Sequence, residues 1–144
     1  MTSEPLRVAD IMSQDIRTLG RNDKLSIADD IMKQGRIRHM PVVDADGIVC
    51  GVLSQRDLFR GVLLRSLGYG SRLEDKLLDS HPVKEAMAEG LHTATPDMLA
   101  TEAARIMMEN KVGCLPVLED DKLVGIVTES DFVKLIAEDQ DSRP

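Results

Sequence analysis

The sequence Gly51-Val-Leu-Ser54-Gln-Arg-Asp57 occurs a second time, in changed form, as Gly125-Ile-Val-Thr128-Glu-Ser-Asp131. Both stretches consist of a glycine, two apolar residues, a hydroxyl residue, two variable residues and an aspartate. The apolar pair is typical of a strand anchored in a core, and the hydroxyl residue is typical of a helix cap. The pattern therefore predicts a strand that runs directly into a helix, twice in one chain.

The two stretches belong to a longer internal repeat. At an offset of 75 residues, Met12 aligns with Met87, and Pro41-Val42 aligns with Pro116-Val117. After the prolines the second copy is one residue shorter, so that the offset becomes 74. An internal duplication predicts two units that contain the same series of elements.

Each repeat predicts a first helix. The helical apolar positions of the two copies are Leu25, Ala28, Ile31 and Met32, and Leu99, Ala103, Ile106 and Met107. Gly35 is the expected terminator of the first of these helices, and Asp97 is the expected N-cap of the second.

Two apolar runs follow each first helix. They cover residues 40–43 and 48–53 in the first repeat and 115–118 and 123–127 in the second. Polar turn residues separate the runs, which predicts two β-hairpins with both faces covered. Ser54 and Thr128 are the expected caps of a second helix in each repeat.

We therefore expect a mixed α+β fold with two pseudo-symmetric units, each a small sheet with two main helices. The predicted boundaries are 8–66 for the first domain, 67–82 for a linker and 83–138 for the second domain. Units of this size bury little apolar surface alone, so we expect them to pack sheet to sheet.

Composition excludes several classes of function. The chain has 144 residues, of which 2% are aromatic, and its 18 Lys and Arg against 25 Asp and Glu give a net charge of −7. A surplus of negative charge repels a phosphate backbone, and so few aromatic side chains offer little surface for stacking bases. We expect no nucleic acid partner. Two cysteines are too few for a disulfide scaffold, which favours a reducing compartment.

The sequence carries no targeting signal that we recognise. No apolar stretch approaches the roughly 20 residues that a membrane-spanning helix needs. The amino terminus has neither the basic start nor the apolar run of a secretion signal. We expect a cytoplasmic protein without a membrane partner.

The hydroxyl residue and the aspartate of each Gly-to-Asp stretch lie three residues apart, so they share one face of the first helical turn. A helix start offers unpaired N–H groups and a partial positive charge, both of which favour an anion. A carboxylate beside them can accept two hydrogen bonds from a vicinal diol. This combination suits the ribose and phosphate of a nucleotide. A plain helix cap is the simpler explanation of each stretch when it is taken alone.

The whole pattern resembles a tandem pair of cystathionine β-synthase (CBS) domains, the arrangement called a Bateman module. The resemblance covers residues 8–136 and depends on Val8-x-x-Ile-Met12, Val83-x-x-Ala-Met87, the hairpin prolines and the two Gly-to-Asp stretches. It implies a regulatory module, not an enzyme, that binds adenosine-containing ligands in clefts between its two units.

Carried over by position, the resemblance implies two clefts with different residues. One cleft combines Ser54, Arg56 and Asp57 with Thr93, Val112, Gly113 and Cys114. The other combines Thr128, Ser130 and Asp131 with Thr18, Ile37, Arg38 and His39. The aspartates hold the ribose hydroxyls, the Ser and Thr hydroxyls contact ribose or phosphate, and the backbone around residues 37 and 112 reads the adenine edge.

The two predicted clefts are not expected to bind alike. Arg38-His39 stands in the first repeat where Gly113-Cys114 stands in the second, and Arg21 stands where the second repeat has Pro96. Arg38 in one cleft and Arg56 in the other are candidate phosphate partners, although solvated surface arginines are an equal alternative.

Other sites have weaker support in the sequence. His39 and Cys114 occupy equivalent repeat positions, but their spacing to Cys50, His81 and His92 matches no zinc pattern, so we expect no metal. We find no nucleophile elbow, phosphate loop or dinucleotide fingerprint, so we expect no enzyme.

We therefore expect a regulatory energy-sensing module that binds AMP, ADP or ATP, needs no cofactor, forms a homodimer and modulates an unidentified protein partner by changing shape. Three alternatives remain: a dimerisation scaffold with vestigial clefts, a regulator that binds S-adenosylmethionine, and a metal-responsive regulator.

Overall fold

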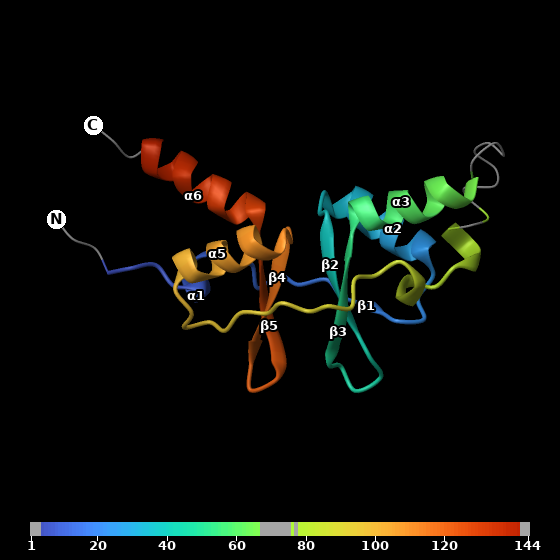
Figure 1. Cartoon of the computed structure of the whole chain (residues 1–144), viewed down its shortest axis with the longest axis horizontal. Helices are drawn as coiled ribbons and strands as arrows, with labels where there is room; N and C mark the ends of the chain where they lie inside the picture. Colours follow the sequence, from blue (N-terminus) through green and yellow to red (C-terminus); the bar gives the residue numbers. More distant parts are fainter. Residues whose placement is uncertain (1–3, 67–75, 77, 142–144) are drawn as a thin grey trace. The chain divides into compact units, whose positions relative to one another are not determined.

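A computed structural model of the chain describes residues 4–66, 76 and 78–141, and these form two compact units (Figure 1). We call Arg17–Leu91 the Asp57 unit, and Met1–Ile16 together with His92–Pro144 the Asp131 unit. The predicted linker at residues 67–82 falls largely outside the described residues. The units differ from the repeats in one respect. The opening segments of the two repeats, residues 8–13 and 83–88, are exchanged: each packs in the unit that the other repeat forms.

The Asp57 unit contains a three-stranded sheet. Its strands are β1 (Leu19–Gly20), β2 (His39–Val43) and β3 (Val49–Ser54), in the order β1-β2-β3. β1 runs parallel to β2, and β2 pairs with β3 in an antiparallel hairpin. The unit also contains α2 (Leu25–Gly35), α3 (Gln55–Ser66) and the short 3-10 helix η1 (Val83–Glu85). Its core is Leu19, Leu25, Ala28, Met32, Met40, Val42, Leu53, Leu58, Val83 and Met87.

The Asp131 unit repeats this plan with a two-stranded sheet. Its elements are α1 (Val8–Ile11), α5 (Ala100–Asn110), β4 (Cys114–Glu119), β5 (Lys122–Thr128) and α6 (Glu129–Asp141). Ala94 forms a single parallel bridge to Val117, at the place where β1 pairs with β2 in the other unit. Its core is Val8, Ala94, Ala103, Met107, Leu115, Val117 and Val127. The predicted hairpins and the α+β class of two small units are thus confirmed.

One of the two expected helix ends is confirmed and the other is wrong. α2 ends at Gly35 as predicted, and the left-handed C-cap is the next residue, Arg36 (φ 53°, ψ 39°), whose N–H donates to the Met32 carbonyl. Lys111 has the same conformation after α5 (φ 55°, ψ 42°). Asp97 is not the N-cap of α5, because residues 95–98 form a turn in which Asp97 accepts a 2.7 Å hydrogen bond from the Thr95 hydroxyl. The N-cap residue is Leu99.

The glycines of the Gly-to-Asp stretches explain why the opening segments are exchanged. A Cβ added to Gly51 would lie 2.6 Å from the Met87 sulfur and 2.9 Å from the Ala88 carbonyl oxygen. A Cβ added to Gly125 would lie 2.6 Å from the Met12 sulfur and 3.1 Å from the Ser13 carbonyl oxygen. Ala88 also forms an antiparallel bridge to Val52 in β3, and Ser13 forms one to Ile126 in β5. Each opening segment therefore lies against the strand, β3 or β5, that the opposite repeat contributes. Only glycine at this point of the strand leaves room for the segment.

We predict that Gly51→Ala lowers the free energy of unfolding by about 1–3 kcal/mol, because the added methyl overpacks a contact that includes backbone. Urea denaturation measures the change. Gly90→Ala is the matched control, since a Cβ at Gly90 meets nothing within 4 Å. Equal stability of the two variants would contradict the close approach.

A second prediction concerns the left-handed cap at Lys111. We expect Lys111→Gly to be more stable than Lys111→Ala by about 1 kcal/mol, because the Cβ of alanine is unfavourable in the left-handed conformation. Both variants lose the same charge, so the charge does not affect the comparison. At Arg105, an exposed position within α5, the order should reverse by about 1 kcal/mol. The same order at both positions would contradict the assigned cap.

Candidate functional site

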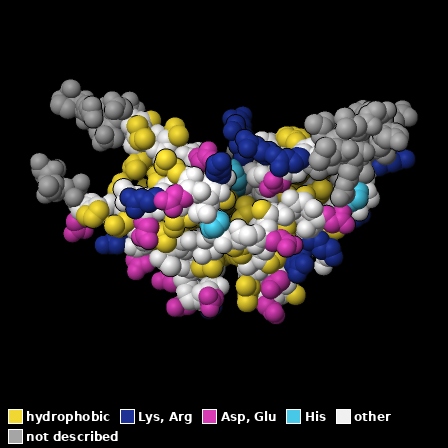
Figure 2. Space-filling view, viewed as in Figure 1, with side chains coloured by type: hydrophobic (Ala, Val, Ile, Leu, Met, Phe, Trp, Pro, Cys, Tyr) yellow, Lys and Arg dark blue, Asp and Glu magenta, His cyan; other side chains and the backbone are white. Residues whose placement is uncertain are grey.

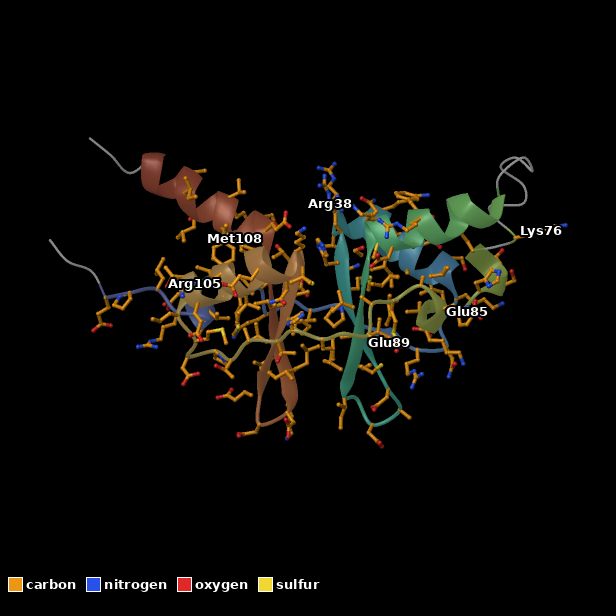
Figure 3. All side chains as sticks on the ribbon, viewed as in Figure 1. Arg38, Lys76, Glu85, Glu89, Arg105 and Met108 are labelled. Atoms are coloured by element: carbon orange, nitrogen blue, oxygen red, sulfur yellow. The ribbon has the colours of Figure 1, made fainter. Side chains whose placement is uncertain are left out.

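The strand-to-helix transition of the Asp57 unit gathers most of its predicted site residues. The register of the hairpin places His39 opposite Ser54, and the Gln55 N–H donates a 2.7 Å hydrogen bond to the Arg38 carbonyl. The start of β2 therefore lies against the start of α3, and Figure 3 labels Arg38 at this end of β2. We call residues 37–39 and 54–57 the Asp57 junction.

Ser54 and Asp57 cap α3 reciprocally. The Asp57 N–H donates to the Ser54 hydroxyl oxygen at 3.0 Å, and the Ser54 N–H donates to Asp57 Oδ2 at 3.3 Å. The predicted capping role of Ser54 is confirmed. The second carboxylate oxygen, Oδ1, accepts no hydrogen bond from any residue in the described part of the chain. One oxygen thus holds the turn while the other remains available to a ligand.

The Asp131 unit builds the equivalent Asp131 junction from residues 112–114 and 128–131. Cys114 lies opposite Thr128, and the Glu129 N–H donates to the Gly113 carbonyl at 3.1 Å. The Thr128 N–H donates to Asp131 Oδ2 at 2.8 Å, so this aspartate also caps its helix through one oxygen. The hydroxyls differ, because Thr128 Oγ1 bonds to Ser130 Oγ at 2.8 Å and donates to Asp131 Oδ2 at 3.4 Å.

The junctions show which predicted site residues are neighbours within a unit. The prediction assigned residues 37–39 and 54–57 to different clefts; the two segments contact each other within the Asp57 unit, and their assignment to clefts stays a prediction. The same holds for residues 112–114 and 128–131. Thr18 and Thr93 directly precede Leu19 and Ala94, which pair with Val42 and Val117. In these parallel registers they lie beside the middle of β2 and β4, close to Pro41 and Pro116.

The backbone N–H groups of residues 37 and 112 already form hydrogen bonds within their own units. The Ile37 N–H donates to the Met32 carbonyl at 3.2 Å, and the Val112 N–H donates to the Met107 carbonyl at 3.1 Å. Both side chains are half-buried against the cores of their units. An adenine edge read at these two residues would therefore meet their carbonyl groups, not their N–H groups.

Two features of the junctions were not found from the sequence. Gln55 and Glu129 occupy variable positions of the Gly-to-Asp pattern, yet their N–H groups join helix to strand. Met12 and Met87 were noted only as motif residues, although each lies against a motif glycine. The glycine itself was the available signal, because a glycine inside a strand is typical of a close approach by another backbone.

The Cys114 thiol is buried at the Asp131 junction, and its pKa is raised. Burial, and secondarily the negative charge of Glu129, raises its pKa from 9.0 to about 12. A thiol is reactive as the thiolate, so Cys114 is inert at neutral pH. Among residues 4–66, 76 and 78–141, no group of three or more His, Cys, Asp and Glu side chains is placed to hold a metal ion.

The raised pKa predicts a pH effect on stability. The unfolded thiol loses its proton above about pH 9, whereas the folded thiol keeps it to about pH 12. The contribution of Cys114 to stability is therefore complete below pH 9 and falls by about 1.4 kcal/mol per pH unit above it. We expect the stability difference between wild type and Cys114→Ala to be constant from about pH 7 to 9 and to narrow at about pH 10. A constant difference would contradict the burial of this thiol.

Comparison with known proteins identifies relatives of both units. The chain matches the CBS domain family at residues 8–64 and 83–138. The AcuB protein of Vibrio cholerae has the same fold, with a TM-score of 0.79 and 34% identity over 96% of this chain and 97% of that one. The CBS domain pair of protein MJ0100, solved with 5-methylthioadenosine and S-adenosyl-L-methionine, has a TM-score of 0.77 and 25% identity over 94% and 99% of the two chains.

Some relatives are much longer than this chain. A homoserine O-acetyltransferase of Methanohalobium evestigatum is 30% identical over 91% of this chain, which covers 24% of that enzyme. The chain spans between 24% and 44% of the length of three curated relatives that it matches. Within the described part of the chain, no helix has the length and apolar character needed to cross a membrane.

Proposed function

The chain belongs to the CBS domain family, and on that premise we propose that it is a regulatory module that binds adenosine-containing compounds at its two junctions. The ligand class comprises AMP, ADP, ATP and S-adenosylmethionine. The module performs no reaction itself. It acts by favouring one conformation when a ligand binds that conformation more tightly, and a protein partner responds to the change.

One observation carries this proposal: in each unit an aspartate beside a helix start has one oxygen in the cap and the other available. Oδ2 of Asp57 and of Asp131 accepts the N–H of the preceding hydroxyl residue. Oδ1 of each is left to accept hydrogen bonds from the two hydroxyls of a ribose. The partial positive charge at the start of α3 and α6 adds attraction for a phosphate.

The relative MJ0100 supports the adenosine class. Its CBS domain pair was solved with two adenosine derivatives, and its fold matches this chain over nearly the whole length. The two junctions of this chain offer the same kind of group twice, so we propose one ligand for each unit.

A scaffold function is the second candidate, and the capping pattern itself favours it. The reciprocal Ser54–Asp57 bonds are what a capping box requires with no ligand at all. Exposed apolar residues also suit an interface between two copies of the chain: Met108 on α5 is 79% exposed, and Val133 and Ile136 on α6 are 67% and 64% exposed. We propose a cytoplasmic homodimer under either function.

Isothermal titration with adenosine, AMP, ATP and S-adenosylmethionine tests the proposal. We expect Asp57→Asn and Asp131→Asn each to weaken one binding event by tenfold or more, because a hydrogen bond to a charged group contributes about 1.5–3 kcal/mol. Asparagine keeps a carbonyl oxygen for the cap, so the loss reports on ligand contact and not on unfolding.

Asp44→Asn is the matched control for this experiment. Asp44 also accepts backbone N–H groups, those of Asp46 and Ile48, but it lies in the hairpin turn between β2 and β3. Its replacement should leave binding unchanged. No binding of any adenosine compound, or wild-type binding by both aspartate variants, would favour the scaffold function.

A further inference from the structure

The two junctions have the same backbone but different charges. Arg38 and Gly113 are equivalent, since the carbonyl of each accepts the N–H of the first residue of the following helix. Arg56 corresponds to Ser130, and Gln55 corresponds to Glu129, at the repeat offset of 74. The Asp57 junction therefore carries two guanidinium groups that the Asp131 junction lacks. The Asp131 junction carries an additional carboxylate.

The two arginines are available to a ligand. Both side chains are exposed, and neither guanidinium group has a hydrogen bond or ion pair with another residue in the described ranges. In Figure 2, Lys and Arg side chains gather on the surface over β2 and the start of α3. The exposed Arg36 and Arg60 correspond to Lys111 and Lys134 in the other repeat, so the difference between the junctions rests on Arg38 and Arg56. The Asp57 junction thus presents basic groups that its own unit leaves unneutralised.

The charge of whole units shows the same difference. Arg17–Leu91 contains 12 Lys and Arg against 11 Asp and Glu, so the Asp57 unit has a net charge of +1. Met1–Ile16 and His92–Pro144 contain 6 against 14, so the Asp131 unit has a net charge of −8. The net negative charge of the chain therefore comes from the Asp131 unit. Such a field acts on a charged ligand beyond its direct contacts.

The Cys114 thiol lies close enough to Glu129 to be affected by its negative charge. Its pKa is raised partly by the negative charge of Glu129, the first residue of α6. Glu129 and Asp131 are both in the first turn of α6, whereas Asp57 is the acidic residue in the first turn of α3. An anion would meet two carboxylates at the Asp131 junction.

We propose that the two junctions select adenosine compounds by the charge of the 5′ substituent. The Asp57 junction selects a 5′-polyphosphate, and the Asp131 junction selects an uncharged or cationic 5′ substituent such as a sulfonium. This inference rests on the proposed function, because it assigns a ligand class to each proposed site. Guanidinium groups form paired, charge-assisted hydrogen bonds with phosphate oxygens. Carboxylates attract a cation and repel a phosphate. The chain would then sense two different metabolite classes at once.

Single-site backgrounds separate the two junctions for the test. Asp131→Asn leaves the Asp57 junction intact, and Asp57→Asn leaves the Asp131 junction intact. Each protein is titrated with two matched ligand pairs. ATP and adenosine differ in the phosphates, whereas S-adenosylmethionine and S-adenosylhomocysteine differ in one methyl group and the sulfonium charge.

In the Asp131→Asn background we expect ATP to bind at least tenfold more tightly than adenosine. In the Asp57→Asn background we expect ATP to bind no more tightly than adenosine, and S-adenosylmethionine to bind more tightly than S-adenosylhomocysteine. Arg38→Gly and Arg56→Ser give the Asp57 junction the residues of the other repeat. Each should lower the ratio of ATP to adenosine affinity by about tenfold, the effect of one charge-assisted hydrogen bond. Arg38→Gln serves the same purpose where glycine would weaken β2.

The outcomes distinguish this inference from the proposed function. Adenosine binding in both backgrounds with equal ATP-to-adenosine ratios would overturn the charge assignment and leave the proposed function in place. The same conclusion follows if both arginine substitutions leave the ratio at its starting value. Absence of binding by all four ligands in wild type would overturn the proposed function, and the charge assignment with it.

Discussion

The hydrogen bond from the Gln55 N–H to the Arg38 carbonyl, and its counterpart from Glu129 to Gly113, join the beginning of one strand to the beginning of the helix that follows its partner strand. The bond continues the hairpin pairing by one step, so the first turns of α3 and α6 lie against the segments that follow α2 and α5. With it, a helix start, a capping aspartate and a strand entrance form one continuous surface. The variable residues of the Gly-to-Asp pattern then face a fixed neighbour, so a change at one of them changes the charge of the whole junction.

Close packing behind the junction keeps this surface in place. Met87 lies against Gly51, and Met12 lies against Gly125. The bridges from Ala88 and Ser13 add backbone hydrogen bonds to the same strands. Both segments enter from the opposite repeat, so neither repeat forms its unit from its own residues alone. A duplicated sequence of this size gains core by the exchange, because each unit then buries the apolar residues of two segments.

Duplication preserved the backbone of the junctions and altered their charges. The caps, the hairpin registers and the left-handed residues Arg36 and Lys111 recur at equivalent positions. Three junction positions differ between the copies: Gly113, Ser130 and Glu129 stand where the first copy has Arg38, Arg56 and Gln55. Backbone geometry is constrained by packing, whereas exposed side chains at a helix start are not, so ligand preference can diverge while the fold is kept.

The amino-acid sequence by itself determined the repeat, the hairpins and the apolar faces of the helices, because each depends on spacing within a short window. It also determined that a hydroxyl residue and an aspartate share the first turn of α3 and α6. Only the tertiary structure decided which segments meet. Residues 37–39 contact residues 54–57, and Met87 reaches Gly51 across 36 residues of sequence. The cap positions were also decided there, since the left-handed residue after α2 is Arg36 and the N-cap of α5 is Leu99. These features depend on contacts between residues distant in the chain, and local spacing carries no information about such contacts.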